Sequence, residues 1–199
     1  GENQQWYRDN RDRERAEYLE TLARQAQRLK KLTEDLVEAS KASTGNLSVS
    51  RAPTNVKELL GQAVAEYEEK FRAGNLEVVV RQSNEDLTVM ADGRLLWRIL
   101  DNLLNNVSKY VLSGTRVYLT AEQVGQAAVL SVKNVSRDPL NISAEELMER
   151  FVRGDAARSG EGSGLGLNIA RSLAQLQNGD LRITIDGDLF KAEIALELA

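Results

Sequence analysis

Two asparagines in the segment from Asn102 to Tyr110 have a spacing that could support chemistry, since Asn102 and Asn106 lie four residues apart. In a helix such residues share a face, and apolar residues one and two turns earlier predict that this face is buried. An amide is costly to bury unless its hydrogen bonds are satisfied, so the pair favours a polar guest such as Mg²⁺ with phosphate oxygens. Lys109 adds a positive charge for phosphate. The simpler alternative is the polar end of an ordinary helix.

A second stretch is rich in glycine and comes directly before an expected helix. Glycines occupy alternate positions in the run Gly160-Glu161-Gly162-Ser163-Gly164-Leu165-Gly166-Leu167. Glycine lets the backbone approach an anion closely, and the free N–H groups at a helix start can bind that anion. The run is not a P-loop, because no Lys-Ser/Thr pair follows it, and no register fits the dinucleotide fingerprint G-x-G-x-x-G. The alternative is a flexible linker.

Composition excludes several other kinds of site. The 199 residues include neither histidine nor cysteine, which excludes a zinc site built on those residues, a Ser-His-Asp triad and a cysteine nucleophile. A net charge of −4 makes the chain a poor candidate for general nucleic-acid binding. No apolar run approaches the ~20 residues of a membrane span. The chain begins with Gly1 rather than Met, so we expect a piece of a longer protein.

The residue pattern in the N-terminal part of the chain predicts one long helix. Apolar residues recur at steps of three and four between Leu19 and Ala39, which gives a narrow stripe close to a heptad seam. Such a stripe cannot bury itself alone, so we expect pairing with a helix from an upstream segment or a second chain. Packing on the chain's own domain is the alternative. The pattern breaks at Ser43–Pro53, where Leu47–Val49 could be a short extended piece.

The rest of the chain mixes helical and extended patterns. The residues Asn55, Asp92 and Ser143 are suited to cap helices. We expect helices over 56–73, 93–107, 144–151 and 165–176, and strands over 76–80, 87–90, 116–123, 127–133, 181–185 and 190–196. The last four strands form hairpins around Gly125 and Gly187. The predicted fold is a two-layer α/β sandwich preceded by a long coiled-coil-like helix.

Together the two polar stretches resemble a known family. Asn102–Tyr110 resembles the N box, and Gly162–Leu167 the second glycine box, of sensor histidine kinases, which belong to the ATPase group that includes gyrase and MutL. Phe151–Asp155 resembles the phenylalanine box between them. Arg28–Gly45 resembles the second helix of the kinase dimerisation domain.

The resemblance covers about residues 14–199 and implies a division of the chain. Residues 1–45 would be part of the dimerisation and histidine-phosphotransfer region, and residues 46–53 would be a linker. Residues 54–199 would form a catalytic ATP-binding domain with the Bergerat fold.

The resemblance also implies roles for individual residues. Asn106 would be a Mg²⁺ ligand with Asn102 beside it, and both would act with Lys109 in catalysis. The residues implied to bind ATP and Mg²⁺ are Asn102, Asn106, Lys109, Tyr110, Asn134, Arg153, Gly162, Gly164, Leu165, Gly166 and Leu167. The implied reaction is in-line transfer of the γ-phosphoryl group to a histidine, in which positioning and charge neutralisation do most of the catalysis.

The sequence departs from the family pattern in two places. The phosphoacceptor histidine is missing, so we expect the chain to bind ATP without phosphorylating itself. The first glycine box of the family reads D-x-G-x-G, whereas the aligned stretch here is Asn134–Asp138. An amide therefore stands where the family's Asp accepts a hydrogen bond from the adenine amine. Losing the charge costs about 1 kcal/mol, so we expect binding that is weaker or less selective for adenine.

The resemblance implies the cytoplasmic catalytic portion of a two-component sensor kinase whose parent protein lies in a bacterial membrane. Its partners would be a response regulator, which receives the phosphoryl group on an aspartate, and a second copy that pairs through the N-terminal helices. No nucleic acid is expected, and membrane attachment would lie in the upstream part.

Two alternatives stay open. One is a degenerate nucleotide-binding or scaffolding module without kinase output, which Asn134 favours. The other is a serine or protein kinase of the same ATPase group, such as an anti-sigma factor. The long N-terminal helix argues against it.

Overall fold

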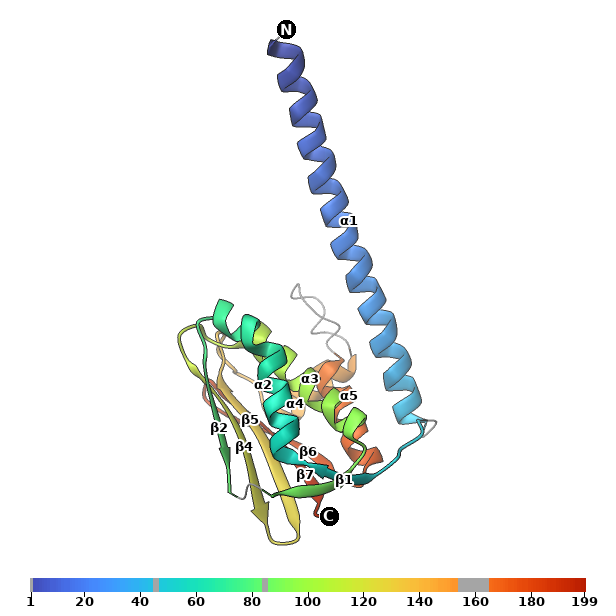
Figure 1. Cartoon of the computed structure of the whole chain (residues 1–199), viewed down its shortest axis with the longest axis vertical. Helices are drawn as coiled ribbons and strands as arrows, with labels where there is room; N and C mark the ends of the chain where they lie inside the picture. Colours follow the sequence, from blue (N-terminus) through green and yellow to red (C-terminus); the bar gives the residue numbers. More distant parts are fainter. Residues whose placement is uncertain (1, 45–46, 84–85, 154–164) are drawn as a thin grey trace.

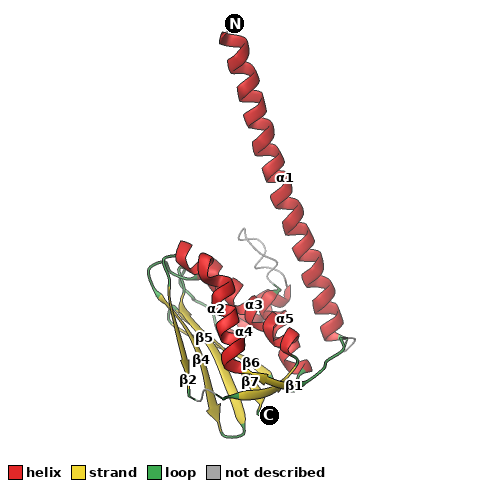
Figure 2. Ribbon diagram, viewed as in Figure 1, coloured by secondary structure: helices red, strands yellow, loops and turns green. Residues whose placement is uncertain are grey.

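The computed structural model describes residues 2–44, 47–83, 86–153 and 165–199. A single long helix, α1 (Glu2–Ser43), runs away from a compact body that contains all the strands, as Figure 1 shows. The remaining helices are α2 (Val56–Ala73), α3 (Gly93–Tyr110), α4 (Ala144–Arg153) and α5 (Gly166–Leu176). Helices α2 to α5 lie on one face of the main sheet, so the expected two-layer α/β sandwich is confirmed (Figure 2).

The main sheet has five strands in the order β2-β4-β5-β7-β6. Their bounds are β2 Glu77–Gln82, β4 Arg116–Val124, β5 Ala127–Val135, β6 Asp180–Asp186 and β7 Leu189–Glu197. The β2–β4 pair is parallel and the other pairs are antiparallel. Alternate residues of β4, β5 and β7 are buried, as expected for strands with one face against a helical layer. The hairpin turns contain Gly125 at φ +61° and Gly187 at φ +58°, which confirms both predicted turns.

A second, two-stranded sheet includes a strand that the sequence does not predict. The strand β1 (Ala52–Asn55) follows shortly after Leu47–Val49, which belongs to no strand, and pairs antiparallel with β3 (Thr88–Ala91). Pro53 lies within β1, opposite Met90. Proline is tolerated there because a two-stranded sheet has edges where no N–H is needed. The strand overlaps the last two residues of the range predicted as linker.

Helices α2, α3 and α4 begin at the predicted caps. The side chain of Asn55 accepts from the Glu58 N–H at 3.1 Å, and that of Ser143 accepts from the Glu146 N–H at 3.1 Å. Asp92 Oδ1 accepts from the Arg94 N–H at 3.1 Å at the start of α3. Each cap satisfies backbone donors that a helix start leaves unpaired, and so fixes where the helix begins.

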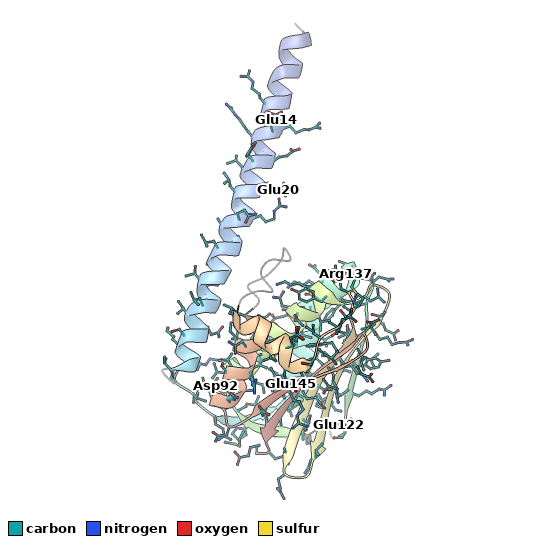
Figure 3. All side chains as sticks on the ribbon, turned by 180° about the vertical axis from the view of Figure 1, so that it is seen from behind. Glu14, Glu20, Asp92, Glu122, Arg137 and Glu145 are labelled. Atoms are coloured by element: carbon teal, nitrogen blue, oxygen red, sulfur yellow. The ribbon has the colours of Figure 1, made fainter. Side chains whose placement is uncertain are left out.

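Asp92 does more than cap α3. Its Oδ2 accepts from the Ser50 N–H at 3.0 Å and from the Arg94 side chain at 2.9 Å, and its own N–H donates to Gln177 Oε1 at 2.7 Å. Gln177 is completely buried and follows α5, and its Nε2 donates to the Leu173 carbonyl at 3.2 Å. The start of α3 is thereby tied to the end of α5, at the place labelled Asp92 in Figure 3.

The large apolar residues of the α1 stripe whose side chains the structure describes are exposed. Tyr18, Leu19, Leu22, Leu29 and Leu36 are each more than half exposed. Glu14 and Glu20 lie on the part of α1 that extends beyond the body, and both are exposed (Figure 3). These exposed residues could pair with another helix, and the expected pairing stays a prediction.

No helix in the described part of the chain is both long enough and apolar enough to cross a membrane.

We predict that Asp92→Asn destabilises the fold at neutral pH and not in acid. Burial raises the pKa of Asp92, but hydrogen bonds from Arg94, Ser50 and Leu95 outweigh that effect, so the pKa lies below its usual value. A carboxylate with a lowered pKa stabilises the folded state above its unfolded pKa of about 3.9, and this stabilisation disappears as pH falls through the folded pKa. Urea denaturation should show a loss of about 1–2 kcal/mol at pH 7 that narrows below about pH 4.

The exposed Asp180 supplies the control, since Asp180→Asn should leave the free energy of unfolding at pH 7 nearly unchanged. An equal loss for Asp92→Asn at neutral and acidic pH would show that the carboxylate charge contributes nothing there.

Candidate nucleotide site

The asparagine face of α3 meets the start of α5. Asn102 is only 5% exposed, and its Nδ2 donates to the Arg98 carbonyl at 2.9 Å. Its Oδ1 faces Gly166, the first residue of α5, where an added Cβ would lie 3.2 Å from that oxygen. The predicted glycine position is therefore one where a larger side chain would press on the predicted asparagine. The structure brings Asn102 and Gly166 into contact.

The N-terminus of α5 carries no side-chain cap. Leu165 occupies the cap position in a helical conformation and makes no capping hydrogen bond with its side chain, while Leu167 is buried. The first-turn N–H groups of a helix attract anions when no side chain caps them. The start of α5 is thus chemically suited to phosphate, and it lies against the Asn102 face.

Asn134 lies at the end of β5, on the sheet face that the helices cover. It is 3% exposed, and its Oδ1 is buried without a hydrogen-bond partner among the described residues. Backbone hydrogen bonds hold this strand end beside the end of α3: the Leu112 N–H donates to the Val135 carbonyl at 2.9 Å, and the Arg137 N–H donates to the Tyr110 carbonyl at 2.7 Å. A buried acceptor therefore lies near the end of the helix that carries the asparagines.

The structure describes some of the other predicted site residues and leaves the rest outside its described part. Asn106, Lys109 and Tyr110 are half-buried on the last turns of α3, and Lys109 and Tyr110 each interact with another part of the chain. Arg153 ends α4, but its side chain lies outside the described part. Gly162 and Gly164 also lie outside the described residues. The structure thus brings residues of α3, α5 and β5 together and leaves the central glycines unplaced.

One polar network beside the site is not evident from the motifs. Arg98 Nε contacts Glu38 Oε2 of α1 at 2.8 Å, and Arg98 Nη1 contacts Asp101 Oδ2 at 3.2 Å. The Tyr67 hydroxyl donates to Asp101 Oδ1 at 2.7 Å. Burial and the hydrogen bond to Asp101 raise the pKa of Tyr67 above its usual value, so the hydroxyl stays protonated. The network connects α1 and α2 to the residue whose carbonyl holds Asn102.

A sequence signal for this network exists, although it is weak. Arg98 and Asp101 are three residues apart and Arg98 and Asn102 four, so each pair can meet on one helix. Glu38 is sixty residues away, and no pattern in the sequence connects it to α3.

Comparison with known proteins decides the family. The profile of the family described as histidine kinase-, DNA gyrase B-, and HSP90-like ATPase matches residues 91–197, which include α3, α5 and β5. The chain belongs to this family. It contains the catalytic ATP-binding domain of the sensor histidine kinases, with the Bergerat fold.

Individual relatives agree with this assignment. The signal transduction histidine-protein kinase BaeS of Escherichia coli is 30% identical over 153 residues, which are 76% of this chain and 32% of BaeS. The chain spans from about a third to just under half of the length of the curated relatives it matches.

Solved structures share the fold. Full-length ShkA in complex with AMPPNP has a TM-score of 0.79 at 23% identity, with 94% of this chain and 39% of that chain covered. The histidine kinase ThkA in complex with the response regulator protein TrrA has a TM-score of 0.68 at 24% identity, with 90% of this chain and 50% of that chain covered. The arrangement of α3, α5 and the sheet is thus that of histidine kinases.

We predict that alanine has opposite effects at two helical glycines. Gly61 lies within α2 with open space around it, so Gly61→Ala should stabilise the fold by about 0.5–1 kcal/mol through helix propensity. Gly166→Ala should not stabilise the fold, because the new methyl group presses on Asn102 Oδ1, whose amide is held by the Arg98 carbonyl. Chemical denaturation of both variants measures the difference. An equal gain at both glycines would mean that the contact between α3 and α5 is loose at Asn102.

Proposed function

We propose that this chain binds Mg-ATP and transfers the γ-phosphoryl group to a histidine on another polypeptide segment, for relay to an aspartate of a response regulator. The chain contains no histidine of its own, so the acceptor must come from outside its 199 residues. The observation that carries the proposal is the contact between Asn102 and Gly166, which joins the asparagine face of α3 to the start of the helix that follows the glycine-rich stretch.

The described side chains fit a nucleotide with a divalent cation. The buried Oδ1 of Asn134 needs a donor, and an exocyclic purine amine supplies one. Asn106 lies one turn from Asn102, and its amide oxygen is a suitable ligand for Mg²⁺. The uncapped start of α5 suits phosphate oxygens. When bound, Mg²⁺ neutralises part of the negative charge on the phosphates.

We assign the remaining residues of the proposed site roles that the family resemblance implies and that suit their chemistry. Asn102 keeps the start of α5 in place, and Lys109 and Arg153 supply positive charge for the phosphates. Tyr110 lines the base side of the site. The residues Gly162, Gly164, Leu165, Gly166 and Leu167 form its phosphate side. In such a site the protein contributes positioning and electrostatic stabilisation rather than an attacking group.

We also propose how the chain fits a larger protein. Residues 1–45 would be a dimerisation helix, whose exposed apolar stripe pairs with that of a second copy. Residues 46–53 would link it to the ATP-binding domain at 54–199. The parent protein would be a membrane-anchored sensor with this part in the cytoplasm and without a nucleic-acid partner. The solved ThkA–TrrA complex and the sensor relatives support the response regulator as partner.

One observation favours a second candidate, a nucleotide-binding or scaffolding module without kinase output. Asn134 stands where the family has an aspartate, and the glycines of that box are replaced by Ser136 and Asp138. Ser136 and its neighbours are held by backbone hydrogen bonds to the α3 end and to Asp188, so this loop is fixed in place. A site that holds nucleotide without transfer would have these features.

We predict that Asn106→Ala weakens binding of Mg-ATP by more than about tenfold, equivalent to ~1.4 kcal/mol, because it removes an oxygen ligand of the cation. Calorimetric titration with ATP, with and without Mg²⁺, measures the change. Asn105→Ala is the matched control, since it removes the same side chain one position along α3. Equal affinities of the two variants and the parent for Mg-ATP would show that Asn106 is not a ligand of the metal.

The transfer reaction can be tested by supplying the missing acceptor. We expect the chain, mixed with a dimerisation domain that carries the phosphoacceptor histidine, to transfer label from γ-labelled ATP to that domain. A domain whose histidine is replaced by glutamine should stay unlabelled, and Asn106→Ala should lower the rate. Saturable nucleotide binding without any label transfer would favour the module without kinase output.

A further inference from the structure

Two buried side-chain polar atoms in the described part of the chain have no hydrogen-bond partner: Nε2 of Gln82 and Oδ1 of Asn134. Gln82 ends the edge strand β2 and is only half-buried. Asn134 is different, because it is 3% exposed and lies in a central strand, between β4 and β7. An acceptor left unsatisfied in such a place costs about 1–3 kcal/mol, which a ligand with a suitable donor would recover.

The position of Asn134 fixes the direction from which that donor comes. Ala128, Leu130 and Val132 precede it at alternate positions of β5 and are buried under the helices, so Asn134 points to the same layer. The hydrogen bonds of Val135 and Arg137 keep this strand end against Tyr110 and Leu112 at the end of α3. A ligand donor would therefore enter between the sheet and the last turn of α3.

An amide can recognise two opposite hydrogen-bonding edges. It carries an acceptor and a donor side by side, and rotation by half a turn about its last bond exchanges them. Adenine presents a donor at the 6-amino group and an acceptor at N1, whereas hypoxanthine and guanine present an acceptor at the 6-oxo group and a donor at N1. A carboxylate that faces position 6 of the base could only accept there, so it would repel a 6-oxo group.

We infer that Asn134 allows the site to take both 6-amino and 6-oxo purine nucleoside triphosphates. The inference rests on the proposed function, in which residue 134 contacts the base. The observation that carries the inference is the buried amide oxygen, which has no hydrogen-bond partner among the described residues and lies on the face toward the end of α3. Asn134 then determines which purine nucleotides bind. Its replacement by aspartate restricts binding to nucleotides with a 6-amino group.

The test compares ATP, ITP and GTP, each with Mg²⁺, in calorimetric titrations of the full chain and of Asn134→Asp. For the parent chain we expect dissociation constants for ATP and ITP within about threefold of each other. For Asn134→Asp we expect ITP to bind at least about tenfold more weakly than ATP, because the carboxylate faces the 6-oxo group. GTP differs from ITP only by the 2-amino group. The difference between their affinities therefore measures whether the site has room for a substituent at C2.

A matched control adds the same charge elsewhere. Asn141 is exposed, so Asn141→Asp should keep the ATP-to-ITP ratio of the parent. A parent chain that prefers ATP over ITP by more than about tenfold would overturn the inference and leave the proposed function intact. A parent chain that binds none of the three nucleotides at millimolar concentration would overturn the proposed function itself. The ATP and ITP affinities of the parent chain test the inference even if Asn134→Asp does not fold.

Discussion

The contact between Asn102 and Gly166 is the constraint on which the site depends. A buried amide must satisfy both its donor and its acceptor, and Asn102 gives its donor to the Arg98 carbonyl one turn earlier on α3. Its oxygen is then directed at the first residue of α5, where glycine leaves just enough room. The position of α5 is therefore set by a polar side chain as well as by apolar packing. A helix start that must receive an anion needs a fixed position of this kind.

The opposite end of the same helix pair is fixed by a separate polar contact. Asp92 caps α3 and donates its N–H to Gln177, which follows α5 and is completely buried. Two polar contacts, one at each end, prevent α5 from sliding along α3, whereas apolar side chains alone would tolerate several registers. Between them Ile99, Leu103, Ile169 and Leu173 are completely or almost completely buried. The apolar contacts stabilise the pair, and the polar contacts determine its register.

Much of this arrangement could be predicted from the sequence, because the relevant signals are local. Asn55, Asp92 and Ser143 mark helix starts, and Gly125 and Gly187 mark hairpin turns, since each acts on its own neighbours. The spacing of Asn102 and Asn106 likewise indicated a shared helix face. The strand at Ala52–Asn55 could not be predicted, because Pro53 argues against a strand and its partner β3 is distant in the sequence.

The parts of the site that the sequence could not reveal depend on contacts between distant segments. That Gly166 presses on Asn102 follows from the packing of α5 on α3. That the Asn134 oxygen lacks a partner in the described part of the chain depends on the layer above β5, since an asparagine at a strand end is more often solvated. The roles of Arg153, Gly162 and Gly164 stay predictions, since the structure does not describe their side chains or the central part of the glycine run.

The attachment of α1 has a consequence of its own. Among the α1 side chains that the structure describes, Glu38 is half-buried and the others are exposed, and Glu38 is held by Arg98. This joint between α1 and the body therefore includes an ion pair, whose contribution to stability is sensitive to ionic strength. Because Arg98 also supplies the carbonyl that holds Asn102, the residue that pairs with α1 is one that borders the asparagine face.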